Sequence, residues 1–502
     1  MIGGGATGLG TALEAASRGY QVLLVERYDF AKGTSSRSTK LVHGGVRYLE
    51  QGNIGLVRGA LHERGLLLHH AAHLAHPLAF IIPAYHYWQL PFYGTGLKIY
   101  DALAGKLSLG KSRILSKERV VSQLPNVETS GLKGGIIYFD GQFDDSRLAI
   151  SLLRTIQDLG GHAANYAEVV SLIKSNNKLC GAVIRDAESG QEYSVRAKMI
   201  INATGIFTDS IRDLDDPQAA NIIAVAQGSH LVLPEKFLKS KSALMVPKTS
   251  DGRVLFAIPW HQRLVVGTTD FGVPKPVEEP QIQPQEVDFI LSEAAKYLAE
   301  DPTESDVLAC YTGLRPLVKH GGSKSTAALS RDHTVLISES GLVTITGGKW
   351  TTYRHMGEDC LNHAEEVAGF EHRPSKTAEL NLHGCSAAAE IFAPPEHLAV
   401  YGTDRKSIEE TAKTDAKAGE RLHPRLPYLT AEATWAIDRE MARTIEDILS
   451  RRTRALLLDV KAAVEAAPQV ARLLAEKLSR DTAWETKQVQ EFSTLAKHYS
   501  LN

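Results

Sequence analysis

Three glycines near the start of the chain have the spacing that binds the diphosphate of a dinucleotide. Gly3, Gly5 and Gly8 fit the pattern G-x-G-x-x-G, and Glu26 follows the apolar segment Gln21–Val25. Glycines let the backbone approach a diphosphate closely, and the helix behind them directs its N-terminus at the negative charge. A carboxylate at the tip of the next strand can accept both hydroxyl groups of an adenosine ribose. We therefore expect a dinucleotide cofactor here.

This site requires a strand–turn–helix–strand unit. The sequence predicts a helix over residues 9–18, ended by Gly19, and a strand over residues 21–25. Only Met1 and Ile2 precede the glycines, whereas the first strand of such a fold usually supplies about five apolar residues at the centre of a parallel sheet. We interpret the start as truncated or misassigned, and expect an upstream apolar extension to raise cofactor occupancy.

A loop rich in hydroxyl groups follows the predicted ribose-binding strand. Five of the six residues from position 34 to 39 are serine or threonine. Their place favours contacts with the middle part of the cofactor over the alternative, a solvated loop without a ligand. Paired glycines then allow close approach to a ring system. The cofactor-binding residues expected from this stretch are Thr34, Ser35, Ser36, Gly44 and Gly45.

The apolar patterns predict an α/β chain with three parts. Alternating strands are expected over 168–175, 180–186 and 192–197, and a buried strand over 198–202 leads into a turn of small residues. The expected cofactor-binding parts are about 1–76, 144–213 and 330–375. An inserted mixed-sheet domain is expected over about 77–143 and 214–329, and a helical C-terminal domain over 376–502.

Several elements of these parts are predicted individually. Short strands are expected in 77–143, and the inserted sheet should contain strands at 222–226, 230–233, 243–246, 254–258 and 264–268. Residues 430–458 place Ile437, Met441, Ile445 and Ile448 on one face of a single helix. Acidic residues come early in this helix and Arg451, Arg452 and Arg454 come late, as the helix dipole favours.

Composition excludes several classes of protein. A chain of 502 residues with 43% hydrophobic and 23% charged residues is typical of a multidomain globular enzyme. The net charge of −2 gives no general attraction to nucleic acid. No apolar stretch is long enough to span a membrane, and neither a signal peptide nor a calcium-binding loop is evident. The four cysteines are far apart, which argues against a metal site and fits a reducing cytoplasm.

Nine segments together resemble the FAD-dependent glycerol-3-phosphate dehydrogenases. They are GGGATG (3–8), TSSRSTKLVHGGVRYLE (34–50), INATG (201–205), QGSHLVL (227–233), VVGTTD (265–270), TGLRPL (312–317), LSRDHTV (329–335), TGGKWTTYR (346–354) and MARTIEDILSRRTRALLLD (441–459). The resemblance implies an FAD-binding Rossmann-like domain of the glycine/D-amino-acid oxidase type, with an inserted mixed or antiparallel-sheet substrate domain and a helical C-terminal domain. It also places Ala203, Thr204, Gly205, Gly347 and Gly348 at the cofactor.

The resemblance implies oxidation of sn-glycerol 3-phosphate to dihydroxyacetone phosphate with reduction of FAD. Respiratory members of the family pass the electrons to membrane quinone, which is the leading interpretation. One alternative is an oxidase that uses oxygen and makes hydrogen peroxide, although no insertion of the oxidase kind is evident. A second alternative, from another class, is a flavin-binding protein without catalytic activity, which is disfavoured because the charged site residues are present.

The substrate is a small dianion with a secondary alcohol, so it needs several cationic groups. The matching family positions hold Arg47, Arg315, Arg331 and Lys349, and Tyr48 is a further candidate for hydrogen bonding to the substrate. If only one of these side chains were present, a surface salt bridge would be its more common role. A base with a pKa near the working pH should remove the hydroxyl proton, and His230 occupies the family position. His43 is the competitor, but it is expected to contact the flavin, and Arg354 is expected to be structural or near the flavin.

An unusually aromatic stretch, residues 80–93, is followed by basic residues. Aromatic rings beside basic groups suit shallow insertion among anionic lipids. The alternative is an ordinary core strand with a solvated basic tail. Quinone access favours the lipid interpretation, with the protein peripheral on the cytoplasmic face of the cell membrane; a homodimer is compatible with the resemblance. The basic residues are Lys98, Lys106, Lys111 and Arg113.

Overall fold

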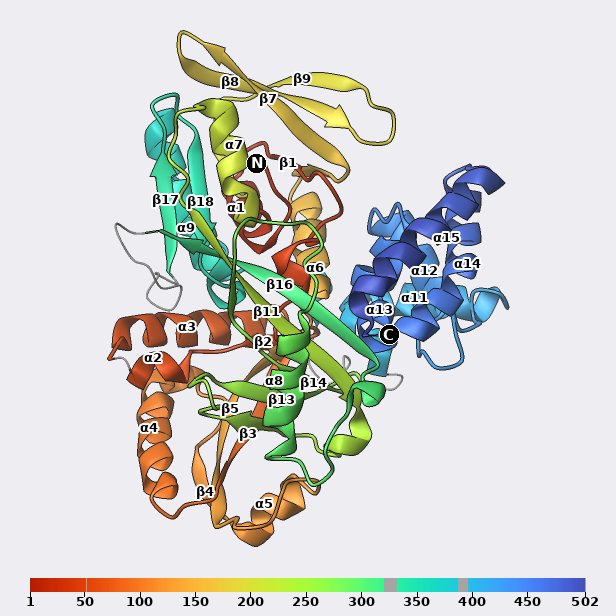
Figure 1. The fold of residues 1–502 in the computed structure, drawn as a ribbon. Helices are drawn as coiled ribbons and strands as arrows, with labels where there is room; N and C mark the ends of the chain where they lie inside the picture. Colours follow the sequence, from red (N-terminus) through yellow and green to blue (C-terminus); the bar gives the residue numbers. More distant parts are fainter. Residues whose placement is uncertain (51, 320–331, 387–395, 502) are drawn as a thin grey trace.

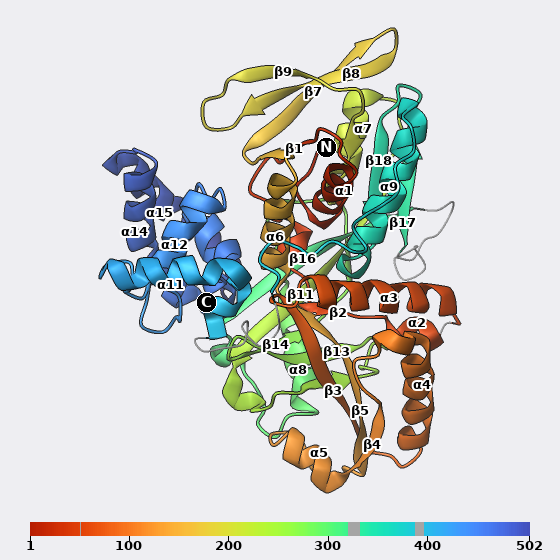
Figure 2. The ribbon, with the colours of Figure 1, turned by 180° about the vertical axis from the view of Figure 1, so that it is seen from behind.

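The computed structural model describes residues 1–50, 52–319, 332–386 and 396–501. Two sheet-containing parts are stacked in Figure 1, and a bundle of helices from the C-terminal part of the chain lies beside them. In both Figure 1 and Figure 2 this bundle is on the side opposite β17 (His333–Ile337) and β18 (Val343–Gly347). Two long strands, β11 (Ile223–Pro234) and β16 (Ala309–Val318), run between the two sheet-containing parts.

The upper part in Figure 1 contains short parallel strands. β1 (Leu23–Val25) pairs with β6 (His162–Ala164), and β10 (Ile201–Asn202) pairs with β18. Ile2 forms parallel bridges to Val25 and to Asn202, so it joins the two strand groups at the position of the first strand. The strand of the dinucleotide unit predicted at 21–25 is therefore present, two residues shorter than expected.

Three helices cover these strands: α1 (Ala6–Ser17), α6 (Asp145–Asp158) and α9 (Tyr353–Ala368). Glycine makes the crossing of α1 and α9 close, because a Cβ on Gly10 would lie 2.8 Å from the Tyr353 carbonyl oxygen and one on Gly357 would lie 2.7 Å from that of Gly10. The alternating strands predicted after α6 form an antiparallel meander. Its strands are β7 (Ala167–Ser175), β8 (Lys178–Asp186) and β9 (Glu192–Arg196).

The lower part is a ten-stranded mixed sheet in the order β15-β11-β14-β13-β12-β3-β5-β2, with β16 also paired to β11 and β4 to β5. All pairs are antiparallel except β12 with β3. The other strands are β2 (Leu41–Val42), β3 (Ala75–Ala84), β4 (Arg113–Ser116), β5 (Gly134–Phe143), β12 (Ala243–Val246), β13 (Leu255–Trp260), β14 (Arg263–Gly267) and β15 (Phe271–Val273). The helices of this part and its borders are α2 (Val46–Glu50), α3 (Ile54–His70), α4 (Gln89–Ala104), α5 (Lys117–Gln123) and α8 (Pro284–Ala295). α7 (Thr208–Asp215) belongs to the upper part, where it contacts β7 and β10.

Two predictions for this sheet were wrong in detail. Short strands were expected in 77–143, but this region holds the ten-residue strand β5, most of the ten-residue strand β3 and the long helix α4. The strands predicted at 222–226 and 230–233 are one continuous strand, β11, that passes through Gly228. Gly228 makes room for a side chain of the neighbouring strand: a Cβ there would lie 2.2 Å from an amino nitrogen of Arg315.

The C-terminal part is helical, as predicted, but 430–458 is not one helix. α12 ends at Arg439, Met441 has a left-handed backbone (φ 60°), and a π-helical turn follows over Asp447–Arg452. The late arginines do not lie at the end of one helix; they are buried and form ion pairs. The described helices are α11 (Arg405–Thr414), α12 (Thr430–Arg439), α13 (Ala455–Leu458), α14 (Val460–Lys477) and α15 (Thr482–Ala496). Among the described residues, no helix is both long and apolar enough to cross a bilayer.

Candidate active site

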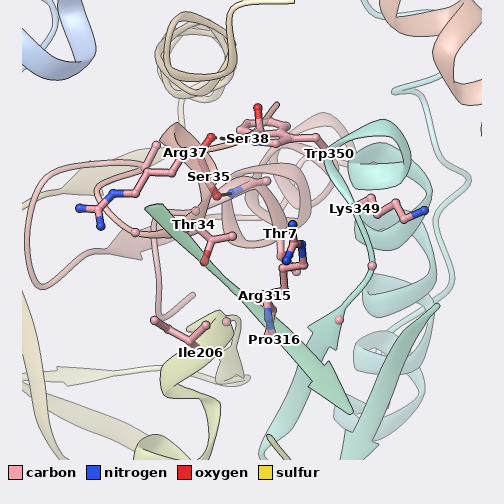
Figure 3. A pocket seen from close by; sticks show the side chains of 18 of the residues that line it. Thr7, Thr34, Ser35, Arg37, Ser38, Ile206, Arg315, Pro316, Lys349 and Trp350 are labelled. Atoms are coloured by element: carbon pink, nitrogen blue, oxygen red, sulfur yellow. Dashed lines mark hydrogen bonds between the residues drawn. The ribbon is translucent and has the colours of Figure 1, made fainter. Parts of the chain in front are cut away.

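A cavity of about 900 Å³ lies between the upper strands and the two strands β11 and β16. Figure 3 draws residues from both sides, among them Thr7 of α1, Thr34 and Ser35 of the hydroxyl loop, and Arg315 of β16. Most of the predicted site residues line this cavity: Gly3, Gly5, Glu26, Thr34, Ser35, His43, Gly45, Tyr48, Ala203, Thr204, Gly205, His230, Arg315, Gly347, Gly348 and Lys349.

The glycine turn presents bare backbone at one end of the cavity. Gly3 has φ of 104°, and a Cβ there would lie 2.6 Å from the Ala203 carbonyl oxygen. α1 begins behind the turn with no side-chain cap and no acidic residue in its first turn, so its positive end faces the cavity. Gly8 lies behind the turn, where a Cβ would be 1.9 Å from the Gly3 oxygen. The Gly3 amide donates to the Val25 carbonyl at 2.9 Å, so Gly5 and the helix N-terminus face an anion, while Gly3 and Gly8 permit the close packing.

Glu26 stands at the end of β1 and is held by backbone. Its carboxylate accepts hydrogen bonds from the amide of Gly4 at 2.6 Å and from that of Tyr28 at 2.9 Å. Each carboxylate oxygen therefore retains acceptor capacity toward the cavity that it lines. This arrangement fits the ribose hydroxyl groups of an adenosine.

The hydroxyl loop is fixed from three directions. Ser35 Oγ accepts from the Ala6 amide at 2.9 Å, the Thr34 hydroxyl donates to the Leu314 carbonyl at 2.5 Å, and the Trp350 indole donates to the Ser35 carbonyl at 2.8 Å. Ser36 and Gly44 are not among the cavity-lining residues, so the structure places both in the supporting layer. The Gly44 amide donates to the Tyr100 hydroxyl, and a Cβ on Gly44 would collide with Leu61.

Arg315 is held in the cavity by acceptors on two neighbouring segments. One amino nitrogen donates to the Gln227 carbonyl and to Asp270 Oδ1, each at 3.3 Å. The other donates to the Thr268 hydroxyl and to the Thr269 carbonyl, each at 3.1 Å. About a third of the side chain, 32%, remains exposed, so the guanidinium can still meet an anion in the cavity.

A buried carboxylate, Glu286 of α8, ties these two segments together. It is fully buried and accepts from the Gln227 side-chain amide at 2.6 Å, from the Ser229 hydroxyl at 2.8 Å and from the Thr269 hydroxyl. Gln227 and Thr269 are also the residues whose carbonyl oxygens accept hydrogen bonds from Arg315. Glu286 therefore fixes the frame in which the Arg315 guanidinium lies.

His230 is buried within hydrogen-bond reach of the hydroxyl loop. Its Nε2 and Thr39 Oγ1 are 2.9 Å apart, and its ring stacks on Tyr311 with 4.7 Å between centroids. Burial, with Lys40 and Arg315 nearby, holds the pKa of His230 well below 6.5. The expected pKa near the working pH is therefore wrong for this structure. The imidazole is neutral at neutral pH and has a nitrogen able to accept a proton.

The remaining predicted residues fall into three groups. Lys349 donates to the Tyr48 hydroxyl at 2.6 Å and lies over its ring at 4.1 Å, which pairs a cation with a phenol at the cavity wall. Arg331 and the side chain of Arg47 lie outside the described residues; the backbone of Arg47 is in α2. Arg354 has a structural place, because Glu63 accepts two hydrogen bonds from it at 2.6 and 2.8 Å.

Sequence reasoning missed the charged residues behind the hydroxyl loop and behind Arg315. Lys40 and Asp145 form a fully buried ion pair at 2.7 Å, and Arg454 adds a second cation to Asp145 at 2.6 Å. Lys40 stands inside the motif that carries the resemblance, so its position was a signal. Asp145 and Glu286 gave no such signal, since each lies in an ordinary amphipathic helix pattern.

The fold and this site define a class of protein, the FAD-dependent oxidoreductases. The family model described as FAD dependent oxidoreductase matches residues 1–354, and the model described as C-terminal domain of alpha-glycerophosphate oxidase matches residues 376–485. The glycine turn, the carboxylate at the end of β1 and the long cavity are suited to FAD. Glycine oxidase from Geobacillus kaustophilus shares the fold, with a TM-score of 0.55 at 17% identity over 77% of this chain and 98% of that one.

Closer relatives narrow the class. The chain is 42% identical to mitochondrial glycerol-3-phosphate dehydrogenase of Homo sapiens over 98% of this chain and 72% of that protein. It is 40% identical to the probable mitochondrial glycerol-3-phosphate dehydrogenase of Caenorhabditis elegans, over 98% of this chain and 72% of that protein. The structure of glycerol-3-phosphate dehydrogenase from Bacillus halodurans complexed with FAD superposes with a TM-score of 0.80 at 28% identity, over 99% of this chain and 94% of that one. The chain therefore belongs to the FAD-dependent glycerol-3-phosphate dehydrogenase family.

Proposed function

We propose that this protein oxidises sn-glycerol 3-phosphate to dihydroxyacetone phosphate with FAD and passes the electrons to a membrane quinone. The observation that carries the proposal is the pairing of a cation and a neutral imidazole in one cavity. Arg315 and His230 come from the neighbouring strands β16 and β11, and both line the cavity next to the hydroxyl loop. A phosphorylated secondary alcohol needs both groups: a cation for the phosphate, and an acceptor for the hydroxyl proton.

The residues of this chain divide the work as follows. Arg315 binds the substrate through charge-assisted hydrogen bonds and stabilises negative charge that develops on the C2 oxygen. Lys349 and Tyr48 form a second polar wall, and Arg47 and Arg331 are proposed to complete the anion site. His230 accepts the hydroxyl proton as the carbonyl forms. FAD, when bound, takes up the hydrogen of C2 with two electrons.

Cofactor binding is proposed for the residues at the other end of the cavity. The amide of Gly5 with the N-terminus of α1 would bind the diphosphate, with Gly3 allowing its close approach, and Glu26 would bind the ribose. The hydroxyl groups of Thr34 and Ser35 would bind the middle part of FAD, while His43, Gly45, residues 203–205 and Gly347-Gly348 would surround the ring system. Gly8, Ser36 and Gly44 would act one layer behind.

One experiment separates this function from its rivals. Purified protein with FAD is mixed with sn-glycerol 3-phosphate without oxygen, and flavin absorbance is followed; a soluble quinone or oxygen is then admitted. Reduction followed by fast reoxidation with quinone and slow reoxidation with oxygen is expected. Fast reoxidation by oxygen with hydrogen peroxide would identify an oxidase instead. Flavin that stays oxidised would refute the dehydrogenase proposal and favour a flavin-binding role.

We further propose that α4 and β4 dock on anionic lipid. Three aromatic side chains at the start of α4 are largely exposed: Tyr87 by 71%, Trp88 by 59% and Phe92 by 58%. Ile99 and Ile114 extend this apolar surface, and the basic residues Lys98, Lys106, Lys111 and Arg113 are exposed beside it. The ring centres of Trp88 and Phe92 lie 5.8 Å apart. Exposed aromatic rings in contact with each other are unusual on a surface that faces only water.

Binding to liposomes that contain anionic lipid tests this surface. Reversing the four basic charges should weaken binding at low salt, because each near-surface cation contributes about 1 kcal/mol. Replacing Trp88 and Phe92 by serine should weaken binding at low and high salt, with dye reduction retained. Tyr193→Ser on the distant strand β9 is the matched control, since Tyr193 is also exposed, by 49%. Unchanged binding in both test variants would contradict the proposal.

From the resemblance we also propose a homodimer. Analytical sedimentation, which measures the mass of the protein in solution, tests this proposal.

A further inference from the structure

Lys40 is a fully buried cation that the proposed mechanism does not use. Its exposed fraction is 0%, and its Nζ donates to Asp145 Oδ2 at 2.7 Å and to the Ser36 carbonyl at 2.8 Å. Its backbone has φ of 63°, the left-handed region that side chains other than glycine seldom adopt. A buried charge on a strained backbone is costly, so the surrounding contacts must hold it for a reason.

These contacts converge on His230. The neighbouring residue, Thr39, forms the hydrogen bond to the imidazole, and the Ser38 carbonyl accepts the Tyr311 hydroxyl at 3.0 Å. The Tyr311 ring stacks on the imidazole at 4.7 Å, and the Lys40 ammonium lies 5.0 Å from the centre of the same ring. Three successive residues of the loop thus reach the imidazole or the ring that supports it.

The ammonium also holds the loop that carries Thr39. By bonding to the Ser36 carbonyl, Lys40 closes the Ser36–Lys40 turn on itself, and by pairing with Asp145 it ties that turn to the start of α6. Asp145 accepts further hydrogen bonds from the Ser38 amide and hydroxyl at 3.1 and 2.7 Å. Arg454 completes the cluster from the C-terminal part of the chain.

The charges around His230 favour its neutral form. The cations whose charges lower its pKa are Lys40, from the loop, and Arg315, from β16. Each carboxylate in the region lies one residue further away: Asp145 behind Lys40, Asp270 behind Arg315, and Glu286 behind the Ser229 hydroxyl. The neutral groups that face the ring are Thr39 and Tyr311.

We propose that Lys40 is a positioning residue for the oxidation: its ammonium anchors the turn from which Thr39 orients the His230 imidazole. Because the ammonium also lies 5.0 Å from the centre of the Tyr311 ring that stacks on the imidazole, its positive charge disfavours a second positive charge there. The proposal rests on the proposed role of His230 as proton acceptor. Removal of the charge should let His230 bind a proton at higher pH, so the enzyme would lose its base over a wider acidic range. Loss of the anchor should loosen the Thr39–His230 hydrogen bond.

The test measures anaerobic flavin reduction by sn-glycerol 3-phosphate against pH in the FAD-loaded wild type, Lys40→Met and Lys40→Arg. For Lys40→Met we expect about a tenfold lower limiting rate. The acidic limb of the pH profile should move up by about one to two pH units, the shift produced by removing a charge some 5–10 Å away at an effective dielectric constant near 20. Lys40→Arg should restore the position of the limb. FAD content and melting temperature are measured on the same samples.

A lysine outside the cavity supplies the control. Lys174 pairs at 2.9 Å with Asp215, and its own side chain is 36% exposed, so Lys174→Met removes a lysine–aspartate pair that is partly open to solvent. It should lower the melting temperature and leave the acidic limb in place. An unmoved limb in Lys40→Met would overturn the proposal, whether or not the rate falls, and in that case Lys40 only stabilises the fold. If Lys40→Met does not retain FAD, Lys40→Gln is used in its place. A wild type that is not reduced refutes the proposed function itself, which distinguishes the two failures.

Discussion

Replacing Asp29 by asparagine should destabilise the junction between the FAD-binding strands and the C-terminal helices by about 3–5 kcal/mol. Asp29 is completely buried. Arg451 donates to it through Nε at 2.5 Å, and Arg452 donates through both amino nitrogens, one of them at 2.8 Å. Arg451 and Arg452 follow Asp29 by 422 and 423 positions, so the cluster joins two segments that are distant in the chain.

The magnitude follows from what each arginine keeps in the variant. Arg451 retains Glu446 at 2.5 Å and Asp447 at 2.8 Å. Arg452 retains only the Glu440 carbonyl, at 2.6 and 3.2 Å, among its hydrogen bonds in the described residues. Asparagine has the shape of aspartate without its charge, so one buried guanidinium loses its counter-ion. Breaking such a pair from one side costs about 3–5 kcal/mol, whereas an exposed pair contributes at most about 1 kcal/mol.

The pH dependence has a definite sign. Burial opposes ionisation of Asp29, but Arg452 and Arg451 outweigh it and hold the pKa at about 2, below the usual 3.8. A lowered folded-state pKa contributes stability that is fully present above about pH 4 and is lost as the pH falls toward 2. The difference between wild type and Asp29→Asn should therefore be constant near neutrality and shrink between pH 4 and 2.

Urea unfolding followed by circular dichroism and by FAD release measures the effect. The matched control is Glu188→Gln, because Glu188 also pairs with an arginine of the C-terminal part, Arg443, at 2.7 and 2.8 Å. That pair is about one-third exposed, 34% and 35%, so its loss should cost less than about 1 kcal/mol. Equal destabilisation by the two substitutions would refute the reasoning from burial.

Three further predictions concern the cavity. Arg315→Ala should lower kcat/KM for sn-glycerol 3-phosphate about 100-fold, or about 3 kcal/mol, and a loss below tenfold in steady-state kinetics would contradict its role. Glu286→Ala should raise KM about tenfold, whereas Glu286→Gln should stay within threefold of wild type, because the hydroxyl groups of Ser229 and Thr269 can rotate to accept from an amide. Equal KM values for Glu286→Ala and wild type would exclude a positioning role. Glu26→Gln should weaken FAD retention about tenfold, and unchanged flavin content after dialysis would place the ribose elsewhere.

Local sequence predicted the dinucleotide unit because every part of it is local. The glycines, the helix behind them and the carboxylate at Glu26 lie within one strand–helix–strand stretch, and each residue has its own steric or electrostatic reason to be there. The meander after α6 was also foreseeable, since apolar alternation and turn residues determine it. The resemblance then indicated which cations and which histidine to examine.

The helix expected over 430–458 shows where such reasoning fails. The apolar spacing was real, since Ile445 and Ile448 are fully buried. The charges, however, were interpreted by their order along one helix, while their partners Asp29 and Asp145 lie hundreds of residues earlier. Burial of an arginine depends on a counter-ion that only the tertiary fold brings near, and no periodicity within the segment reports it.

The protonation of His230 shows the same limit in the site itself. The residue type suggested a pKa near neutrality, but burial and the two cations Lys40 and Arg315 lower it. Those cations also suit the substrate, because a phosphate dianion bound at Arg315 would offset their positive field at the moment when the imidazole must accept a proton. A base kept neutral by cations and made more basic by its own anionic substrate would act mainly on phosphorylated alcohols. Free glycerol brings no such charge, so it should reduce the flavin far more slowly than sn-glycerol 3-phosphate even when it saturates the site. Single-turnover rates of flavin reduction, measured at saturating concentrations of each alcohol, test this expectation.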